Sequence, residues 1–204
     1  GAGPGDLLLL VSDRNETALD VLGMLRLHLA RRLDLVQDDE PAFVWVTEFP
    51  LLEYDEEEGR LTAVHHPFTA PVEEDRPRLA HEPETVRARA YDLVLNGSEI
   101  GGGSVRIHTR ELQDVMFRTL GIPPEEAEAK FGFFLEALKY GAPPHAGMAL
   151  GFDRMVVIMS GAESIREVIA FPKTQRATCP LSGAPSRVDE RQLRELGIST
   201  EPVE

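Results

Sequence analysis

Hydrophobic and polar positions in the first third of the chain predict strands around one helix. A continuous apolar run at 6–12 predicts a buried strand. Apolar residues recur every three to four positions over 18–33, which predicts an amphipathic helix. A β-branched and aromatic stretch at 43–49 predicts a second strand, and 61–64 predicts a short return strand.

The second half of the chain shows the same mixture of elements. Strand-like runs at 91–95 and 98–107 flank Asn96-Gly97, a dipeptide that favours a tight hairpin turn. Further elements are expected as helices over 109–120 and 152–160, one or two helices over 123–140, a helical turn over 164–168 and a strand over 169–171. This order predicts an α+β fold, an antiparallel β-sheet backed by helices.

The stretch 65–84 shows little apolar periodicity and holds four prolines and three histidines. About 20 residues without regular structure are unusual in a compact domain unless the loop is functional or disordered. Composition alone favours a solvated loop. The alternative is a mobile lid whose histidine touches an anionic substrate. His65 and His66 could also ligate a metal, but no third ligand follows at a suitable spacing.

Composition narrows the class of protein. The 204 residues are 42% hydrophobic and 27% charged, as in a soluble globular protein of one domain or one domain plus a small appendage. No apolar run approaches the ~20 residues of a membrane span. The net charge of −14 argues against a general phosphate-binding surface but not against a local basic site. The single cysteine, Cys179, excludes an internal disulfide and is compatible with a reducing cytosol.

A first candidate site lies around the predicted hairpin. Alternate strand residues share a face, so Ser104, Arg106 and His108 are expected to point the same way. The three glycines at 101–103 suit a place where a ligand or another backbone comes close. The Arg106 guanidinium offers bidentate bonds to a carboxylate. Asp92 and Glu99, on adjacent strands, could hold a hard cation with its waters, as magnesium–phosphate sites do.

A second candidate site is the octet 147–154, in which small residues lead from a strand into a helix. Free backbone N–H groups at the helix start and the guanidinium of Arg154 suit a phosphate and a stacked purine ring. The alternative is ordinary glycine packing, because the octet lacks both the Walker lysine and the dinucleotide-binding spacing.

The octet resembles motif 3 of class II aminoacyl-tRNA synthetases. Other segments resemble the bacterial-type aspartyl-tRNA synthetase family, and the resemblance as a whole extends over roughly 43–196. They are HHPFT at 65–69, AYDLVLNG at 90–97, EIGGGSVRIH at 99–108, FGFFLEALKYGAPP at 131–144 and IAFPKTQR at 169–176.

The resemblance implies the C-terminal half of a class II catalytic core. On this interpretation 1–33 is the end of an insertion domain with the helix returning to the core. Residues 34–176 then form the catalytic half with motif 3, and 177–204 form a C-terminal extension.

The resemblance also implies roles for individual residues. Arg106 would clamp the side-chain carboxylate of aspartate, with His65 and His66 also contacting the amino acid. Asp92 and Glu99 would hold Mg²⁺ with ATP. The implied ATP-binding residues are Glu99, Gly151, Phe152, Asp153 and Arg154, and the implied catalytic residues are Arg154 and Arg106.

The implied activity is that of an aspartate–tRNA ligase. L-Aspartate and ATP would form aspartyl-adenylate and pyrophosphate, and the tRNA 3′ end would then take the aspartyl group. No side chain forms a covalent intermediate, so positioning and charge neutralisation do most of the work. A cytoplasmic location and a homodimer of the full-length protein are implied as well, with no membrane partner.

The sequence departs from the family pattern in several places. Motif 1, motif 2, the N-terminal anticodon-binding barrel and the family's lysine for the substrate carboxylate are not found. We therefore expect the chain to be a C-terminal fragment that forms no aspartyl-adenylate alone. Two alternatives are a non-catalytic module that keeps the pocket and a relative that activates aspartate but amidates it with ammonia.

Overall fold

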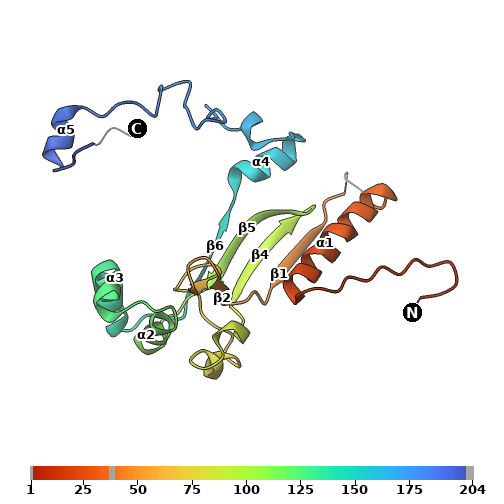
Figure 1. The fold of residues 1–204 in the computed structure, drawn as a ribbon, viewed down its shortest axis with the longest axis horizontal. Helices are drawn as coiled ribbons and strands as arrows, with labels where there is room; N and C mark the ends of the chain where they lie inside the picture. The colour runs from red at the N-terminus through yellow and green to blue at the C-terminus, as the bar shows by residue number, and fades with distance from the viewer. Residues whose placement is uncertain (1, 37–39, 201–204) are drawn as a thin grey trace.

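The centre of the molecule is a four-stranded antiparallel sheet in the order β1-β4-β5-β6 (Figure 1). The computed structural model describes residues 2–36 and 40–200. The four strands are β1 (Phe43–Thr47), β4 (Ala90–Leu95), β5 (Ser98–Val105) and β6 (Ala146–Leu150). A separate antiparallel pair is formed by β2 (Leu52–Asp55) and β3 (Arg60–Ala63). The α+β prediction with an antiparallel sheet is confirmed.

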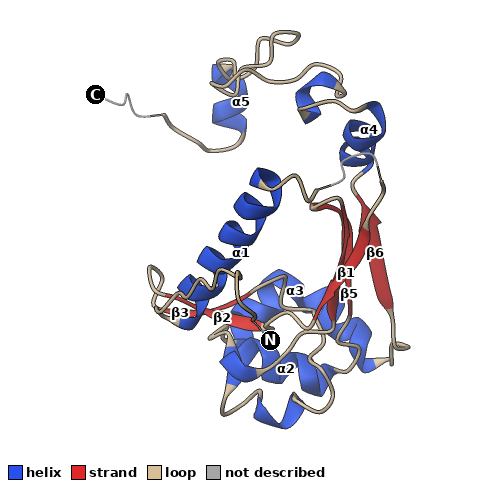
Figure 2. Ribbon diagram, turned by 90° about the vertical axis from the view of Figure 1, so that its right-hand side faces the viewer, coloured by secondary structure: helices blue, strands red, loops and turns tan. Residues whose placement is uncertain are grey.

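Helices α2 (Arg110–Thr119), α3 (Pro124–Lys139) and α4 (Phe152–Ser160) lie at the two ends of the sheet. α2 and α3 lie at one end, and α4 lies at the other, directly after β6 (Figure 2). α1 (Asn15–Arg32) precedes β1, and α5 (Glu190–Glu195) ends an extended C-terminal arm. Short 3₁₀ turns are η1 (Arg76–Arg78), η2 (Pro83–Thr85) and η3 (Ile165–Glu167).

The β4–β5 hairpin forms where the sequence predicts it. Asn96 and Gly97 both have positive φ angles, 48° and 79°, as a two-residue turn that follows the strand twist requires. The Asn96 side chain accepts a hydrogen bond from the Ala42 N–H at 2.7 Å. The turn is therefore tied to the residue that leads into β1.

The buried core lies at the α2–α3 end of the sheet. Phe68, from the loop before β4, meets the rings of Phe117, Phe131 and Phe134 with centroids 5.1–6.2 Å apart. A second cluster joins the same loop to β2 and α2, and it includes Leu52, Leu79, Val86, Ile107 and Met116. The core thus fixes the two segments that carry the histidines and Arg106.

The stretch 65–84 is packed, so the solvated-loop interpretation is wrong. Thr69, Asp75 and Leu79 are at most 2% exposed. The Asp75 carboxylate accepts hydrogen bonds from the Arg87 Nε at 2.8 Å and the Arg87 backbone N–H at 3.0 Å, and it also pairs with Arg78. The bond from Arg87 is the main cause that holds the pKa of Asp75 well below its usual range. Composition hides this order because a buried carboxylate with arginine partners looks like polar surface.

Two predicted strands are absent from the described part of the chain. Residues 6–12 are extended but unpaired, and Leu7, Leu8 and Leu10 are at least 70% exposed. Residues 169–171 form a bend in which Phe171 has a φ of 57°. An apolar run indicates that a segment is able to form a strand, but a strand also needs a neighbouring strand to pair with.

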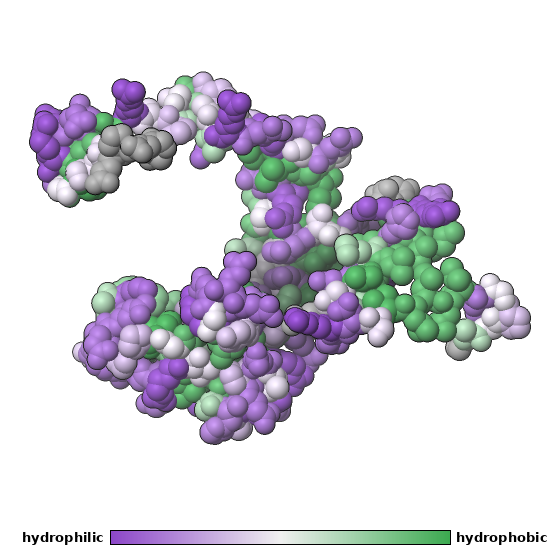
Figure 3. All heavy atoms as spheres, in the orientation of Figure 1, coloured by the Kyte–Doolittle hydropathy of each residue, from purple (hydrophilic) through white to green (hydrophobic). Residues whose placement is uncertain are grey.

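Apolar side chains remain exposed on the β1 side of the molecule. All residues of β1 are exposed, and hydrophobic atoms gather over β1 and α1 (Figure 3). Trp45 is 55% exposed and meets the Tyr91 ring edge-on, with centroids 6.2 Å apart. Across 2–36 and 40–200, no helix combines the length and the apolar character that crossing a membrane would need.

The glycines of β5 allow β6 to approach closely. A Cβ at Gly103 would lie 1.9 Å from the carbonyl oxygen of Gly147, and one at Gly101 would lie 2.6 Å from that of Ala149. These contacts are with backbone, which cannot turn aside as a side chain can. The approach of another backbone therefore accounts for Gly101 and Gly103.

Gly103→Ala is expected to destabilise the protein by about 1–3 kcal/mol, because the new methyl group forces β5 and β6 apart. Gly147→Ala on β6 is the matched control, since a Cβ there meets nothing within 4 Å. Urea unfolding of both variants measures the difference. Equal destabilisation by the two substitutions would contradict the close approach of β5 and β6.

Candidate active site

A cavity of about 540 Å³ lies where β5, β6 and the start of α4 meet. It is lined by all the residues to which the family resemblance assigns a role: His65, His66, Asp92, Glu99, Arg106, Gly151, Phe152, Asp153 and Arg154. These residues come from four separate segments of the chain. The structure thus brings both candidate sites of the sequence into one cavity.

A β-bulge places the two acids on the same face of the sheet. Leu93 pairs with Gly101 and Val94 pairs with Glu99, so Ile100 is an extra residue on β5. Asp92 pairs with Gly102, and directly opposite residues share a face. Without the bulge, Glu99 and Gly102 would point to opposite faces. Because of the bulge, Glu99 and Asp92 face the same cavity.

Arg106 is held by the ring of His66. The Arg106 Nη1 lies 3.2 Å from the His66 Nδ1, and the Phe68 backbone N–H donates to the same nitrogen at 3.2 Å. Both partners are donors only, so Nδ1 is the acceptor and the ring proton of neutral His66 is on Nε2. That Nε2 lies 3.4 Å from the Ser104 Oγ. Arg106 itself lines the cavity next to this pairing.

The chemistry around His66 opposes its protonation. Burial lowers the pKa of His66 below the usual 6.5, and the positive charge of Arg106 and the nearby His65 lower it further. A protonated ring would also carry an N–H at Nδ1, opposite the N–H donors of Arg106 and Phe68. Neutral His66 is therefore the form that fits Arg106.

The depressed pKa of His66 predicts a pH dependence of stability. Below pH 6.5 the unfolded chain takes up the proton before the folded chain does, so the free energy of unfolding falls as the pH drops through this window. His66→Asn keeps an acceptor near the Nδ1 position without the titrating ring and should flatten that fall. The exposed His81→Asn is the control. Urea unfolding between pH 7.5 and 5 tests this, and equal pH profiles for wild type and His66→Asn would contradict it.

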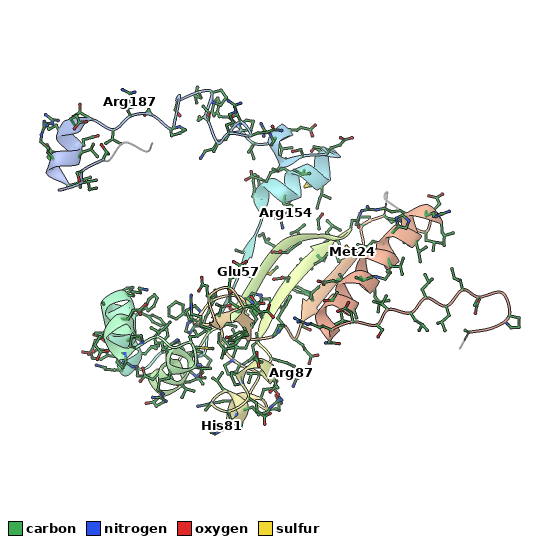
Figure 4. The ribbon with its side chains drawn as sticks, viewed as in Figure 1. Met24, Glu57, His81, Arg87, Arg154 and Arg187 are labelled. Atoms are coloured by element: carbon green, nitrogen blue, oxygen red, sulfur yellow. The ribbon has the colours of Figure 1, made fainter. Side chains whose placement is uncertain are left out.

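Arg154 lies in the first turn of α4, at its junction with β6 (Figure 4). Its Nη1 donates to the Glu99 carbonyl oxygen and lies 3.9 Å from the Glu99 Oε2. The Gly151 N–H donates to the Ile100 carbonyl oxygen at 2.8 Å, which ties the turn to the bulge. Both side chains of the Arg154–Glu99 pair are 52% exposed, so they remain accessible to a ligand.

The remaining site predictions have mixed outcomes. His65 lines the cavity and packs edge-on against Phe49, with ring centroids 4.9 Å apart. Within the described ranges, no group of three His, Cys, Asp or Glu side chains is placed to hold a metal ion. His108 lines a different cavity beside Lys139, so its predicted grouping with Arg106 is wrong. The reason is that β5 ends at Val105 and the alternation does not continue.

The sequence interpretation gave no role to two residues that shape the site. Ser104 is 1% exposed and contacts His66. Ile165 reaches the cavity from η3, far along the chain. The run of three glycines next to Ser104 was the available signal for the first residue. The sequence holds no comparable signal for the second.

Solved structures define the class of the fold. The aspartyl-tRNA synthetase of Entamoeba histolytica matches with a TM-score of 0.52 and 23% identity, over 86% of this chain and 30% of that one. The asparaginyl-tRNA synthetase of Pyrococcus horikoshii matches with a TM-score of 0.50 and 21% identity, over 68% of this chain and 28% of that one. At these identities the comparison shows the fold alone. The fold is that of part of a class II aminoacyl-tRNA synthetase.

The family follows from the sequence. Residues 14–175 match the model of the tRNA synthetases class II (D, K and N). The chain belongs to this family.

Two curated relatives that match most of this chain are aspartate–tRNA ligases. The aspartate–tRNA(Asp/Asn) ligase of Syntrophotalea carbinolica is 61% identical over 198 residues, which are 97% of this chain and 33% of the relative. The aspartate–tRNA ligase of Ruminiclostridium cellulolyticum is 59% identical over 198 residues, with the same coverage. The chain therefore spans about a third of the length of the curated relatives it matches.

Proposed function

We propose that this chain forms the aspartate- and ATP-binding part of an aspartate–tRNA ligase. The observation that carries the proposal is the cavity that Arg106 and Arg154 share, with Asp92 and Glu99 on its wall. Both substrates are anionic, so two separate guanidinium groups suit two separate ligands in one space. The names and high identities of the curated relatives support the choice of aspartate and tRNA.

In this proposal Arg106 binds the side-chain carboxylate of aspartate. A fixed guanidinium matches the planar geometry of a carboxylate. Neutral His66 supports it, since its Nδ1 accepts from Arg106 and orients the group. His65 and His66, from the cavity wall, are assigned further contacts with the amino acid. The side-chain amide of asparagine would place an N–H donor against the N–H donors of Arg106, so binding of asparagine is disfavoured.

Arg154 and the turn before it are assigned to ATP. α4 starts at Phe152, and the N–H groups of its first turn favour phosphate oxygens. The Arg154 guanidinium can stack on the adenine or neutralise phosphate charge. Phe152 is 73% exposed on the cavity wall and offers an aromatic surface beside it.

The donor set at the cavity fits Mg²⁺ bound together with ATP. Mg²⁺ keeps several waters and usually takes one or two carboxylates plus substrate phosphates. Asp92 and Glu99 supply two carboxylates on the same face. When bound, the ion would neutralise phosphate charge. The residues Asp92 and Glu99 would position it, and Arg154 would hold Glu99 in place.

The proposed reaction relies on positioning rather than on a nucleophilic side chain. Arg106 would hold the side-chain carboxylate of aspartate. The α-carboxylate of the same aspartate would then lie against the α-phosphorus of ATP, on the Arg154 side of the cavity. Pyrophosphate leaves, and the tRNA 3′ end then takes the aspartyl group from the adenylate, with AMP as the leaving group. Fixed positive charge in a shaped cavity is the type of contribution that suits such a transfer.

This role also sets the place of the chain within the full-length protein. The chain would comprise an insertion end at 1–33, a catalytic half at 34–176 and an extension at 177–204. The full-length protein would act as a cytoplasmic homodimer, and adenylation would need the remainder of the length found in the relatives.

Aspartate-dependent exchange of pyrophosphate into ATP by the full-length protein tests this function. Exchange with aspartate, with little exchange for asparagine or glutamate, is the expected result. Transfer of the aspartyl group to tRNA distinguishes a ligase from an amidating relative, which would instead form asparagine from ammonia. Absence of aspartate-dependent exchange would refute the proposal.

A further inference from the structure

The segment after η3 is basic in an otherwise acidic chain. Residues 168–188 contain Lys173, Arg176 and Arg187 and no aspartate or glutamate, whereas the whole chain carries −14. Within the structure as described, none of these three cations forms a salt bridge. Such a local excess of positive charge attracts anions that the rest of the surface repels.

An open cavity of about 770 Å³ lies on this segment. It is lined by Arg166, Thr174, Gln175, Arg176 and Thr178. Each of these side chains belongs to the types that contact phosphate oxygens in nucleic-acid complexes: arginine, threonine and glutamine. We call these five residues the basic groove.

The tip of the groove is a hydrogen-bonded loop. The Thr174 N–H donates to the Thr178 carbonyl oxygen at 2.8 Å, and the Thr178 N–H donates back to the Thr174 Oγ1 at 3.2 Å. The Ala177 N–H also donates to the Thr174 carbonyl oxygen at 2.9 Å. These bonds hold Gln175 and Arg176 at the end of a closed loop, which reduces the entropy cost of binding there.

Arg166 remains available despite its acidic neighbour. Glu167 is the third residue of a capping box, and its Oε1 accepts from the Ser164 N–H at 2.9 Å. Arg166 is exposed, and no salt bridge to Glu167 is present in the described structure. The acid is therefore used by the turn itself, and the arginine faces the groove.

The basic groove adjoins the active-site cavity. Ile165 lines the active-site cavity and Arg166, the next residue, lines the groove. Consecutive Cα atoms are about 3.8 Å apart, so η3 contributes neighbouring residues to the lining of both hollows. An extended polyanion with one end in the active-site cavity can therefore reach the groove across η3.

We propose that the basic groove binds the phosphate backbone of the RNA whose 3′ end enters the active-site cavity. This inference rests on the proposed function, which supplies the RNA substrate. Threonine, glutamine and arginine contacts to phosphates position an RNA without reading its bases. The groove therefore acts on RNA affinity and placement, whereas Arg106 and Arg154 act on the small substrates.

The test uses the full-length protein with the double substitution Arg166→Gln and Arg176→Gln. Its affinity for a tRNA transcript should fall roughly tenfold at 0.1 M salt, and the slope of log K against log salt should decrease by about 1–2. Aspartate-dependent pyrophosphate exchange should stay unchanged, because the small substrates do not reach the groove.

The matched control is the double substitution Arg118→Gln and Arg194→Gln, which removes the same charge from exposed positions outside the groove and outside the basic segment. It should leave the affinity and the salt slope near those of wild type. Equal loss of affinity in both double variants, or no loss in the groove variant, would overturn the inference. An RNA duplex without a single-stranded 3′ end is a second probe. An equal loss with that probe would contradict the placement beside the active-site cavity.

The two proposals fail in distinguishable ways. If wild-type protein shows no aspartate-dependent exchange, the proposed function fails, whatever the RNA affinities are. If exchange is normal and the groove variant binds tRNA like wild type, only the inference about the groove fails.

Discussion

Replacing Arg106 by alanine is expected to raise the KM for aspartate by about two to three orders of magnitude, while the KM for ATP changes little. Removing one partner of a close charge pair in a desolvated site typically costs about 2–5 kcal/mol, much of it from the unpaired charge that remains. Here that charge is the side-chain carboxylate of aspartate. Pyrophosphate exchange with varied aspartate and varied ATP separates the two constants.

Two further variants sharpen this prediction. Arg106→Lys keeps the charge but loses the planar fork and the bond to His66, so it should recover only part of the affinity. Arg89→Ala removes an exposed arginine from the strand region without touching the cavity and should resemble wild type. Equal increases in the KM for aspartate and for ATP in Arg106→Ala would contradict the assignment.

Arg154→Ala is expected to reduce kcat/KM for ATP by about 10- to 100-fold with a smaller effect on the KM for aspartate. A hydrogen bond to a charged group contributes about 1.5–3 kcal/mol. The substitution also removes the bond to the Glu99 carbonyl oxygen and the pairing with its carboxylate, so Glu99 loses its orientation. Pyrophosphate exchange at varied ATP and Mg²⁺ measures the effect.

The control for Arg154 is Arg118→Ala, an exposed arginine on α2 at the other end of the sheet. It should leave both constants unchanged. If Arg154→Ala altered the KM for aspartate more than that for ATP, the division of the cavity into two substrate regions would be wrong.

Local signals in the sequence were sufficient for the elements that carry the site. Asn96-Gly97 fixed the hairpin because only a few residues tolerate two positive φ angles, and the structure has both. The helix predicted over 152–160 forms at Phe152–Ser160 and ends at Gly161, whose φ is 65°. These elements depend on neighbouring residues, so a single sequence contains the necessary information.

Long-range packing explains why two predictions failed, the strand over 6–12 and the solvated loop over 65–84. The run at 6–12 is as apolar as a buried strand, yet the described structure gives it no strand partner. The loop at 65–84 looks polar, but Asp75 is buried through pairing with Arg87 and Arg78, which lie elsewhere in the same region. Hydropathy records neither the presence of a partner nor its absence.

The geometry of the site was predictable only in outline. Residue types and the family resemblance pointed to Arg106, Arg154 and the two acids, and the structure brings them to one cavity. The bulge at Ile100 was not predictable, since it depends on the pairing register of β4 with β5. That single extra residue decides whether Glu99 faces Asp92 or the opposite side of the sheet.

A crystal structure of the full-length protein with a non-hydrolysable analogue of aspartyl-adenylate tests the central claim most directly. The account predicts the aspartyl carboxylate within hydrogen-bond distance of the Arg106 guanidinium and the adenylate beside Arg154. An analogue bound outside this cavity, or one with its carboxylate away from Arg106, would contradict it.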